Sequence, residues 1–293
     1  MTKVRKAVIA AAGFGTRFLP QTKAMPKEML PLVDKPVIQF VVEELVEAGI
    51  EDVIIVTGYH KRSIEDHFDD LSADLVKNLL DGNKTDLLEK TRRVSELANF
   101  VYVRQKGPYG NGTPLLCTEH LIGNEPFIYT WADDFIKASP NRFKQLIDIY
   151  KEFHSSVLAG VRANDDENYK KYGFAGGTEV RHGLIDADAI IEKPGKDNAP
   201  SDLATNSAFL LTPDIFGYLK QALEEKDEKS ELFYNDGLKR MLKDDKKVYV
   251  AEIKGGKYYD AGSKLGYLKT VVDFALENPE ISDEFRKYLK SVI

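Results

Sequence analysis

The sequence predicts an α/β fold with a mixed, mostly parallel sheet flanked by helices. Apolar runs of strand length alternate with amphipathic stretches of helical length, a pattern typical of parallel βαβ units. The chain has 293 residues, of which 43% are hydrophobic and 30% charged, enough for a sizeable core. It has one cysteine and a formal net charge of −6. We therefore expect no internal disulfide, a reducing compartment, and no general affinity for nucleic acid.

In the first half, the expected strands are short apolar runs that end in polar or glycine-containing loops. They are Ala7–Ala11, Val53–Thr57, Phe100–Arg104, Phe127–Thr130 and Ser156–Val161. Amphipathic stretches between or after them predict helices at Pro36–Ala48, Arg62–Phe68, Leu115–Leu121 and Asn141–Phe153. Leucine-rich residues Leu71–Leu97 interrupt the alternation and predict two helices joined around Asp81-Gly82-Asn83. In a sheet of this kind, ligands bind beyond the carboxyl ends of the strands.

The second half is less regular and richer in glycine. We expect strands at Ile190–Glu192, Thr205–Leu211 and Val248–Glu252, forming a smaller β subregion beside the ligand site. Leu265–Leu276 and Asp283–Val292 have the pattern of terminal helices.

The N-terminus imitates the start of a secretion signal, because Lys3, Arg5 and Lys6 precede an apolar run. That run is too short, and glycines and Arg17 interrupt it before any cleavage site. No stretch of the sequence is apolar for long enough to span a bilayer. We expect a cytoplasmic protein without a membrane partner.

The first predicted strand runs into a glycine turn with positive charges near it. Gly13-Phe14-Gly15-Thr16-Arg17 follows the apolar run, and Lys27 lies ten residues beyond Arg17. Backbone N–H groups at such a turn point outward and hold anions, and glycine lets a ligand come close. P-loop spacing is absent, and Phe18 stands where a dinucleotide fingerprint has a small residue. Two glycines alone are typical of a tight strand-to-helix turn, but with Arg17 and Lys27 they indicate a polyphosphate site.

The string from Ala12 to Pro31, continued by Asp34-Lys35-Pro36, resembles the signature of the sugar-phosphate nucleotidylyltransferases. The likeness is strongest to the bacterial UTP:glucose-1-phosphate uridylyltransferases. Shorter similarities extend it over nearly the whole chain, at Glu51–Phe68, Arg104-Gln105-Lys106, Ile191–Pro194 and Tyr259–Gly262. The resemblance implies a Rossmann-like fold of the nucleotide-diphospho-sugar transferase type. It also implies a catalytic domain at residues 1–262 and a C-terminal helical extension at residues 263–293, which offers a surface for a homo-oligomer, a dimer or a tetramer.

The implied reaction joins a nucleoside triphosphate to a sugar 1-phosphate and releases pyrophosphate. The attacking phosphate is already ionised, so catalysis depends on positioning and on positive charge. By resemblance, Arg17 neutralises the β and γ parts of the triphosphate, Lys27 lies near its α-phosphate, and Lys193 holds the sugar phosphate. Gly15 and Thr16 belong to the same phosphate loop as Arg17.

Asp133 and Asp134 directly follow a predicted strand. From spacing alone, an Asp-Asp pair is as typical of a helix cap or a turn as of a metal site. The resemblance favours the metal and assigns Asp133 and Asp260 as ligands of Mg²⁺, which takes one or two carboxylates together with substrate oxygens and water.

The base and sugar residues follow from the resemblance as well. Gln105 is placed at the nucleobase edge, where a carboxamide both donates and accepts, although alone it is an ordinary polar strand end. The family pattern adds these contacts to the substrates: Ala11, Ala12, Gly13, Gly110 and Gly112 beside the base, Asp133 beside the phosphates, and Gly173 and Glu192 beside the sugar.

The chain departs from the family pattern where base and sugar are chosen. Thr113-Pro114 replaces the His-Ala of a Gly-x-Gly-His-Ala motif, and Ser207-Ala208-Phe209 replaces a Gly-Arg-Tyr. Ser230–Asp236 keeps the glutamate and the aspartate of another motif but loses its glutamine. Three hypotheses therefore stay open: a uridylyltransferase acting on UTP and glucose 1-phosphate, the same chemistry on another pair such as dTTP and a different sugar phosphate, and a regulatory protein that binds a sugar nucleotide without turnover.

Overall fold

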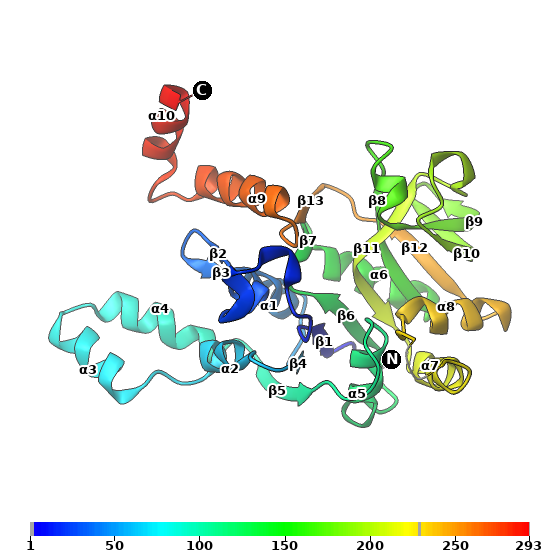
Figure 1. Ribbon diagram of the computed structural model, residues 1–293, viewed down its shortest axis with the longest axis horizontal. Coiled ribbons are helices and arrows are strands. Elements are labelled where there is room, and N and C mark those ends of the chain that lie inside the picture. The colour runs from blue at the N-terminus through cyan, green and yellow to red at the C-terminus, as the bar shows by residue number, and fades with distance from the viewer. Residues whose placement is uncertain (1–2, 228–229, 293) are drawn as a thin grey trace.

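The computed structural model describes residues 3–227 and 230–292, and its core is a nine-stranded mixed sheet (Figure 1). The strand order is β5-β4-β1-β6-β11-β8-β12-β10-β9. Parallel pairing joins the first four strands of this order, which are β5 (Asn99–Arg104), β4 (Asp52–Thr57), β1 (Lys6–Ala10) and β6 (Phe127–Trp131). Their carboxyl ends lie at one edge of the sheet, so the Gly13 turn, Gln105 and Asp133 leave the sheet on the same side, as predicted.

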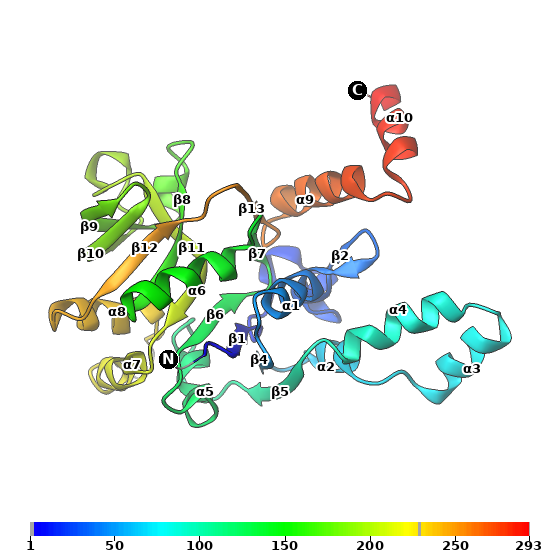
Figure 2. The same ribbon diagram turned by 180° about the vertical axis from the view of Figure 1, so that it is seen from behind.

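Side chains of β1 alternate between two hydrophobic clusters, one on each face of the sheet. Ala7 and Ile9 belong to the cluster under α1 (Val37–Glu47), α2 (Arg62–Phe68) and α6 (Arg142–Phe153). Val8 belongs to the cluster under α5 (Thr113–Ile122), α7 (Asp214–Glu224) and α8 (Tyr234–Lys243). Burial on both faces explains why these strands are continuous apolar runs. Figure 2 shows α1 and α6 on the near face of the sheet.

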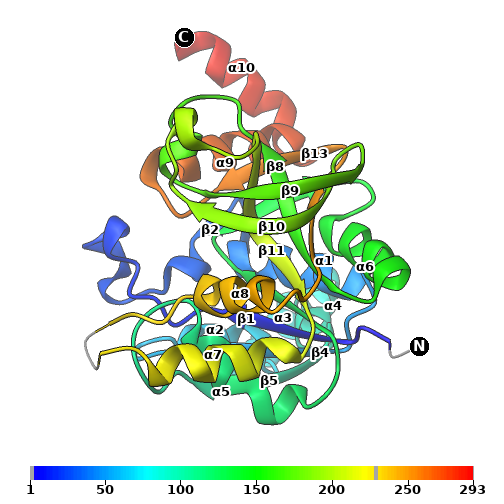
Figure 3. The same ribbon diagram turned by 90° about the vertical axis from the view of Figure 1, so that its right-hand side faces the viewer.

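The second half of the sheet is mostly antiparallel, and the sequence predicted the positions of three of its strands closely. It consists of β11 (Leu203–Leu211), β8 (Ser156–Arg162), β12 (Val248–Glu252), β10 (Leu184–Glu192) and β9 (Gly173–Arg181). Only β8 and β12 pair in parallel here. The sequence predicted just the end of β10 and missed β9, because aspartates interrupt the apolar pattern of β10, and half of β9 is exposed and contains glycines. Figure 3 shows β9 and β10 together with α7 and α8, two helices that the sequence analysis did not predict.

A small second sheet stands at the carboxyl end of β6. It pairs β7 (Asp134–Ala138) with β13 (Gly256–Asp260) in antiparallel register, with Asp134 opposite Asp260. A two-stranded ribbon, β2 (Pro31–Leu32) and β3 (Lys35–Pro36), follows the N-terminal loop. The pairing of β7 with β13 brings two carboxylates together that lie far apart in the sequence.

Two helical segments project from the body of the molecule (Figure 1). The predicted helix pair is confirmed as α3 (Ala73–Asp81) and α4 (Thr85–Ser95), each with one buried leucine. At the other projection, α9 (Lys264–Glu277) packs on the body, whereas α10 (Ser282–Val292) has no buried residue. Among the described residues, no helix has both the length and the apolar character needed to cross a membrane.

Candidate functional site

The loop after β1 folds back on itself through Gly15. This residue has φ 67°, and an added Cβ would lie 3.2 Å from the Thr22 side chain and 3.3 Å from Lys27 Cβ. Glycine is therefore required both by the backbone conformation and by the space. Thr22 Oγ1 donates to the carbonyl of Gly15 at 2.7 Å, which holds the turn against Lys27. Gly13, Thr16 and Arg17 stay exposed at its surface.

The two predicted N-terminal cations reach the ends of two different strands, Lys27 that of β6 and Arg17 that of β13. Lys27 Nζ donates to Asp133 Oδ2 at 2.5 Å, and Arg17 Nη1 donates to the carbonyl of Gly262 at 3.3 Å. Burial alone would raise the pKa of Asp133, but the charge and hydrogen bond of Lys27 outweigh it and hold that pKa below its usual value. Burial alone would lower the pKa of Lys27, but Asp133 and Glu28 raise it above its usual value. Both partners are thus ionised at neutral pH.

A second, deeper ion pair lies behind Lys27. Glu28 and Lys61 are buried, and their charged groups are 2.7 Å apart. Burial raises the pKa of Glu28, although the charges of Lys61 and Lys27 oppose the shift. Glu28 therefore faces two cations, and Lys27 stands between two carboxylates. The sequence analysis did not single out this pair; the only signal was that Glu28 adjoins Lys27 in the signature.

The second predicted metal ligand lies next to the first. Asp260 Oδ1 accepts from the N–H of Gly262 at 3.0 Å. A Cβ added to Gly262 would lie 2.6 Å from Asp133 Oδ2 and 3.2 Å from Asp260 Oδ1. Because Gly262 has no side chain, a space remains that both carboxylates border. Carboxylate oxygens are the ligands that Mg²⁺ prefers. These residues fit a divalent cation bound together with substrate oxygens. Within residues 3–227 and 230–292, no set of three or more His, Cys, Asp or Glu side chains has metal-site geometry.

Asp134 is the most perturbed carboxyl in this region. Burial and the neighbouring Asp133 raise its pKa to about 7, and Asp260 adds to the shift, while Arg142 partly opposes it. We call Arg17, Lys27, Asp133 and Asp260 the ion-pair cluster. It joins the loop after β1, the end of β6 and the end of β13.

The residues assigned to the nucleobase lie at neighbouring strand ends. The N–H of Gln105 donates to the carbonyl of Thr57 at 2.9 Å, which fixes the end of β5 beside β4. A Cβ on Gly58 would lie 2.8 Å from the carbonyl oxygen of Ala12, so the ends of β4 and β1 are in close contact. Ala11 is buried, and Ala12 and Gln105 are partly exposed.

Gly110 and Gly112 pack against the chain before α8. A Cβ on Gly110 would lie 2.1 Å from the carbonyl oxygen of Leu232, and the N–H of Gly112 donates to that same oxygen at 2.8 Å. Thr113, which replaces the family histidine, is buried, and its hydroxyl donates to the carbonyl of Pro108 at 2.7 Å. Packing of this loop accounts for the two glycines, and their contact with a substrate stays a prediction.

The residues assigned to the sugar form a separate group, the Glu192 cluster (Gly173, Glu192, Thr205 and Asn235). A Cβ on Gly173 would lie 3.0 Å from Glu192 Oε1 and 3.1 Å from Thr205 Oγ1. Glu192 accepts a hydrogen bond from Asn235 Nδ2. The surrounding protein displaces water from this carboxyl and raises its pKa, although its side chain remains accessible.

Sequence reasoning missed Asn235 although it noted the residues on both sides of it. Asp236, retained from the family motif, instead caps α8: its Oδ2 accepts from the N–H of Phe233 at 2.9 Å. Glu231 is exposed. The sequence analysis did not predict that α8 begins here. The start of this helix directs Asn235 toward Glu192 and Asp236 toward the helix end.

Lys193, which follows Glu192, is linked to the ion-pair cluster through Tyr172. Its φ is 48°, and its N–H donates to the carbonyl of Tyr172 at 2.9 Å. The ring of Tyr172 lies 5.9 Å from that of Tyr258, two residues before Asp260 on β13. The Lys193 side chain is exposed. Strands β10 and β13 therefore place the two clusters on one side of the molecule.

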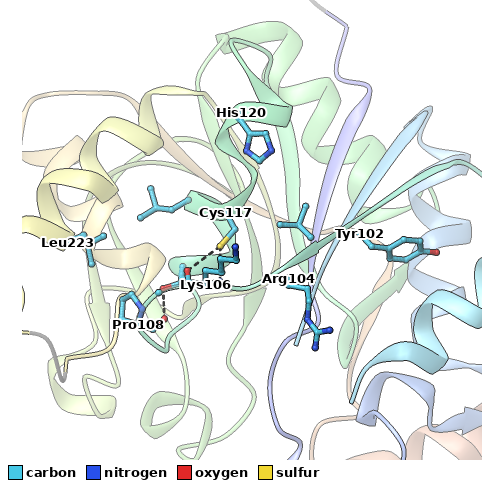
Figure 4. Close-up of a pocket in the computed structure, with 11 residues that line it drawn as sticks. Tyr102, Arg104, Lys106, Pro108, Cys117, His120 and Leu223 are labelled. Atoms are coloured by element: carbon cyan, nitrogen blue, oxygen red, sulfur yellow. Dashed lines mark hydrogen bonds between the residues drawn. The ribbon is translucent and has the colours of Figure 1, made fainter. Parts of the chain in front are cut away.

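A cavity of about 700 Å³ lies outside both clusters (Figure 4). It borders β5, α5 and α7, and its lining includes Lys106, Cys117, His120 and Leu223. The Cys117 thiol lies 3.5 Å from the backbone nitrogen and oxygen of Lys106. None of the residues assigned to substrates or metal lines this cavity.

Residues 6–277 match the family model of the nucleotidyl transferases. The chain belongs to this family. It is 43% identical to the UTP–glucose-1-phosphate uridylyltransferase of Bacillus subtilis strain 168 over 293 residues, which cover 100% of this chain and 98% of that protein. It is 44% identical to UTP–glucose-1-phosphate uridylyltransferase 2 of Staphylococcus saprophyticus, covering 100% of this chain and 99% of that protein.

Solved structures of nucleotidyl transferases have the same fold. A UDP-glucose pyrophosphorylase in complex with UDP-glucose is 39% identical, with a TM-score of 0.82 over 94% of this chain and 100% of that one. A UTP-bound UGPase from Acinetobacter baumannii is 33% identical, with a TM-score of 0.88 over 99% of this chain and 100% of that one. The resemblance drawn from the sequence and the α/β fold class are therefore confirmed.

Proposed function

We propose that this nucleotidyl transferase forms UDP-glucose and pyrophosphate from UTP and glucose 1-phosphate. Relatives named for this activity are 43% identical to it over the whole length of this chain. The observation that carries the proposal is the ion-pair cluster, because two cations and two carboxylates from distant segments come to one place beside strand ends. That inventory suits transfer between two anions, in which charge must be neutralised and the reacting groups aligned.

In the proposed reaction, a phosphate oxygen of glucose 1-phosphate attacks the α-phosphorus of UTP in line. The bond between the α-phosphorus and its bridging oxygen breaks, and pyrophosphate leaves with the electron pair. Arg17 holds the β and γ phosphates, because its planar guanidinium donates two parallel hydrogen bonds. Lys27 turns from Asp133 to the α-phosphate, and Lys193 holds the sugar phosphate. The backbone of Gly13, Gly15 and Thr16 lines the triphosphate.

Asp133 and Asp260 are proposed to hold Mg²⁺ beside these phosphates. When bound, this ion supplies Lewis-acid charge to the phosphate oxygens and helps to align them. The chain contributes the carboxylates and the space beside Gly262 that a side chain would fill. In the absence of ligand, Lys27 neutralises Asp133, which keeps two close carboxylates from repelling each other.

Recognition of the base and the sugar is proposed to depend on hydrogen bonds with amides, a carboxylate and the backbone. Gln105 contacts the uracil edge beside the backbone of Ala11 and Ala12, with Gly110 and Gly112 shaping the adjoining loop. Glu192 accepts from sugar hydroxyls, and Gly173 lets the sugar come close. Asn235 orients Glu192 through its hydrogen bond.

A panel of substrates tests this proposal. Pyrophosphate release is measured with UTP, dTTP, ATP and GTP, each with glucose, galactose and N-acetylglucosamine 1-phosphates, with Mg²⁺ and with EDTA. We expect UTP with glucose 1-phosphate to be turned over best, and no pair to react in EDTA. A preference for dTTP would favour the alternative substrate pair. Thermal stabilisation by UDP-glucose without any Mg²⁺-dependent turnover would favour a regulatory binding protein.

We further propose that the protein works in the cytoplasm as a homo-oligomer, a dimer or a tetramer, with residues 1–262 as its catalytic domain. The extension at residues 263–293 supports this assignment, since its helix α10 has no buried residue and exposes Tyr288. Light scattering of the wild-type chain and of Tyr288→Glu tests the assembly. A wild-type monomer at micromolar concentration would contradict it.

A further inference from the structure

The N-terminal residue of α6 is a buried arginine. Arg142 has no solvent-exposed surface, and a buried charge is unfavourable unless other groups pair with it. Its Nη1 donates to the hydroxyl of Ser207 at 2.7 Å and to the carbonyl of Asp134 at 3.3 Å. Its Nη2 lies 3.4 Å from Glu44 Oε2 on α1, and its guanidinium lies 4.5 Å from the ring centre of Phe143. Three different elements thus contact the guanidinium, although its Nε and Nη2 are buried without a hydrogen-bond partner among the described residues.

Ser207 is held in a conformation that its residue type disfavours. Its φ is 71°, in the left-handed region that L residues rarely adopt. It lies where the register of β11 shifts against β8, between Thr205 and Phe209. Both of its oxygens are used: the hydroxyl accepts from Arg142, and the carbonyl accepts from Thr130 Oγ1 at 2.7 Å. The irregularity in β11 is therefore tied to α6 on one side and to β6 on the other.

All of these contacts converge on the turn that carries the two carboxylates. Thr130 lies on β6, three residues before Asp133, and Arg142 contacts the backbone of Asp134 directly. Asp134 in turn pairs with Asp260 across β7 and β13. Thr130, Arg142 and Ser207 are all buried, so none of them touches a substrate. They hold the turn from the side that faces the core.

We propose that Arg142 is a positioning residue that fixes the Asp133–Asp134 turn, and that the Ser207 hydroxyl fixes Arg142. The turn has two ends, one at β6 and one at β7, and Arg142 with Ser207 ties both to the same point in the core. The consequence for the reaction rests on the proposed function, since it concerns where Asp133 stands relative to Lys27 and Asp260. Residues that orient metal-binding carboxylates typically change affinity or activity by about 10- to 100-fold when removed.

Arg142→Met tests the role of the charge, because methionine fills much of the same space without donors. We expect kcat to fall by about tenfold or more, with KM for glucose 1-phosphate changed by less than about twofold. Arg142→Lys, which retains a charge and a donor, should recover part of the loss. Arg181→Met is the matched control, because Arg181 pairs with Glu152 in an exposed ion pair of β9, and it should behave as wild type. Equal losses in Arg142→Met and Arg142→Lys, or unchanged kcat in Arg142→Met, would overturn the proposal.

Two measurements do not depend on turnover and keep the proposal separate from the proposed function. The first is a double-mutant cycle of Arg142→Met and Ser207→Ala, measured by urea unfolding without metal. The two substitutions should be coupled by about tenfold in the unfolding constant. Paramagnetic Mn²⁺ binding with UTP should be several-fold weaker in Arg142→Met than in wild type. No coupling and unchanged Mn²⁺ affinity would overturn the proposal. If Arg142→Met does not fold, Ser207→Ala decides, and unchanged kcat and Mn²⁺ affinity in that variant would contradict it.

Discussion

The ion-pair cluster and the Glu192 cluster lie on one side of the molecule but are built differently. In the first, Lys27 pairs with Asp133, and the backbone of Gly262 accepts from Arg17 and donates to Asp260. In the second, one carboxylate is held by a neutral amide and faces a glycine. Full charges act strongly on the charge that develops during reaction, whereas neutral hydrogen bonds mainly orient and select. The first cluster should therefore govern turnover, and the second should govern substrate affinity and choice.

The largest effect is expected at the carboxylate that pairs with Lys27. Asp133→Asn should preserve the fold and lower Mg²⁺-dependent kcat by about a thousandfold, because the proposed metal ligand and the partner of Lys27 are lost together. Steady-state pyrophosphate release at saturating substrate measures it. Asp202→Asn, at a partly exposed ion pair with Arg162, is the control and should keep wild-type kcat. Wild-type turnover in Asp133→Asn would remove this residue from the reaction.

A somewhat smaller effect on turnover is expected at Arg17. Arg17→Ala should lower kcat by about a hundredfold while KM for glucose 1-phosphate changes little, since the guanidinium is proposed to neutralise the triphosphate rather than the sugar phosphate. The kcat of Arg17→Lys should lie between those of wild type and Arg17→Ala, because lysine keeps the charge but cannot donate two parallel hydrogen bonds to phosphate. If KM for the sugar phosphate rose and kcat stayed unchanged, the division of labour between the two clusters would be wrong.

Asp134, which adjoins the ion-pair cluster, should make the stability of the fold depend on pH. Asp134 has a folded-state pKa of about 7 against 3.8 ordinarily. A raised acid pKa means that the native state favours the proton, so this group stabilises the fold below pH 4, and that contribution is lost as the pH rises toward and through 7. In EDTA, Asp134→Asn should therefore gain on the order of 2 kcal/mol relative to wild type between pH 5 and pH 8. Urea unfolding at both pH values checks it, and a difference that does not change with pH would refute this reading of Asp134.

The smallest effect is expected in the Glu192 cluster. Asn235→Ala should raise KM for glucose 1-phosphate by about tenfold, the loss of a hydrogen bond to a charged group, and leave kcat within about threefold. Asn99→Ala is the control, because it removes an exposed amide that donates to the carboxylate of Asp52 away from both clusters, and it should keep the wild-type KM. A loss in kcat as large as that of Arg17→Ala would mean that the two clusters do not differ in function.

The sequence predicted the strands of the N-terminal half of the fold well for a physical reason, whereas the residues of the ion-pair cluster were assigned from the family resemblance. Strands β1, β4 and β6 are buried on both faces, so their apolar runs are unambiguous, and each ends at the shared edge. The signature loop is long and charged. The contacts of these charged residues, however, depend on the pairing of β7 with β13, and the sequence analysis predicted neither strand.

The sugar side was harder to predict because its strands and helix lack a clear period. Strand β9 is half exposed. Helix α8 begins inside the Ser230–Asp236 motif, and the sequence alone did not show which residues of that motif face the sugar side. The departures at Thr113 and Ser207 concern packing in this structure: both residues are buried, and their hydroxyls bond to Pro108 and Arg142. A cation from α6 thus stands beside the position where the family pattern has arginine and this chain has Ala208.

A crystal structure with UDP-glucose tests the central claim most directly, namely that the two clusters bind the two ends of one substrate. The account predicts that Lys27 leaves Asp133 for a phosphate oxygen, that Gln105 contacts the uracil, and that Glu192 accepts from sugar hydroxyls. A sugar nucleotide bound elsewhere, for example in the cavity beside Lys106, with the Lys27–Asp133 pair still closed, would contradict it.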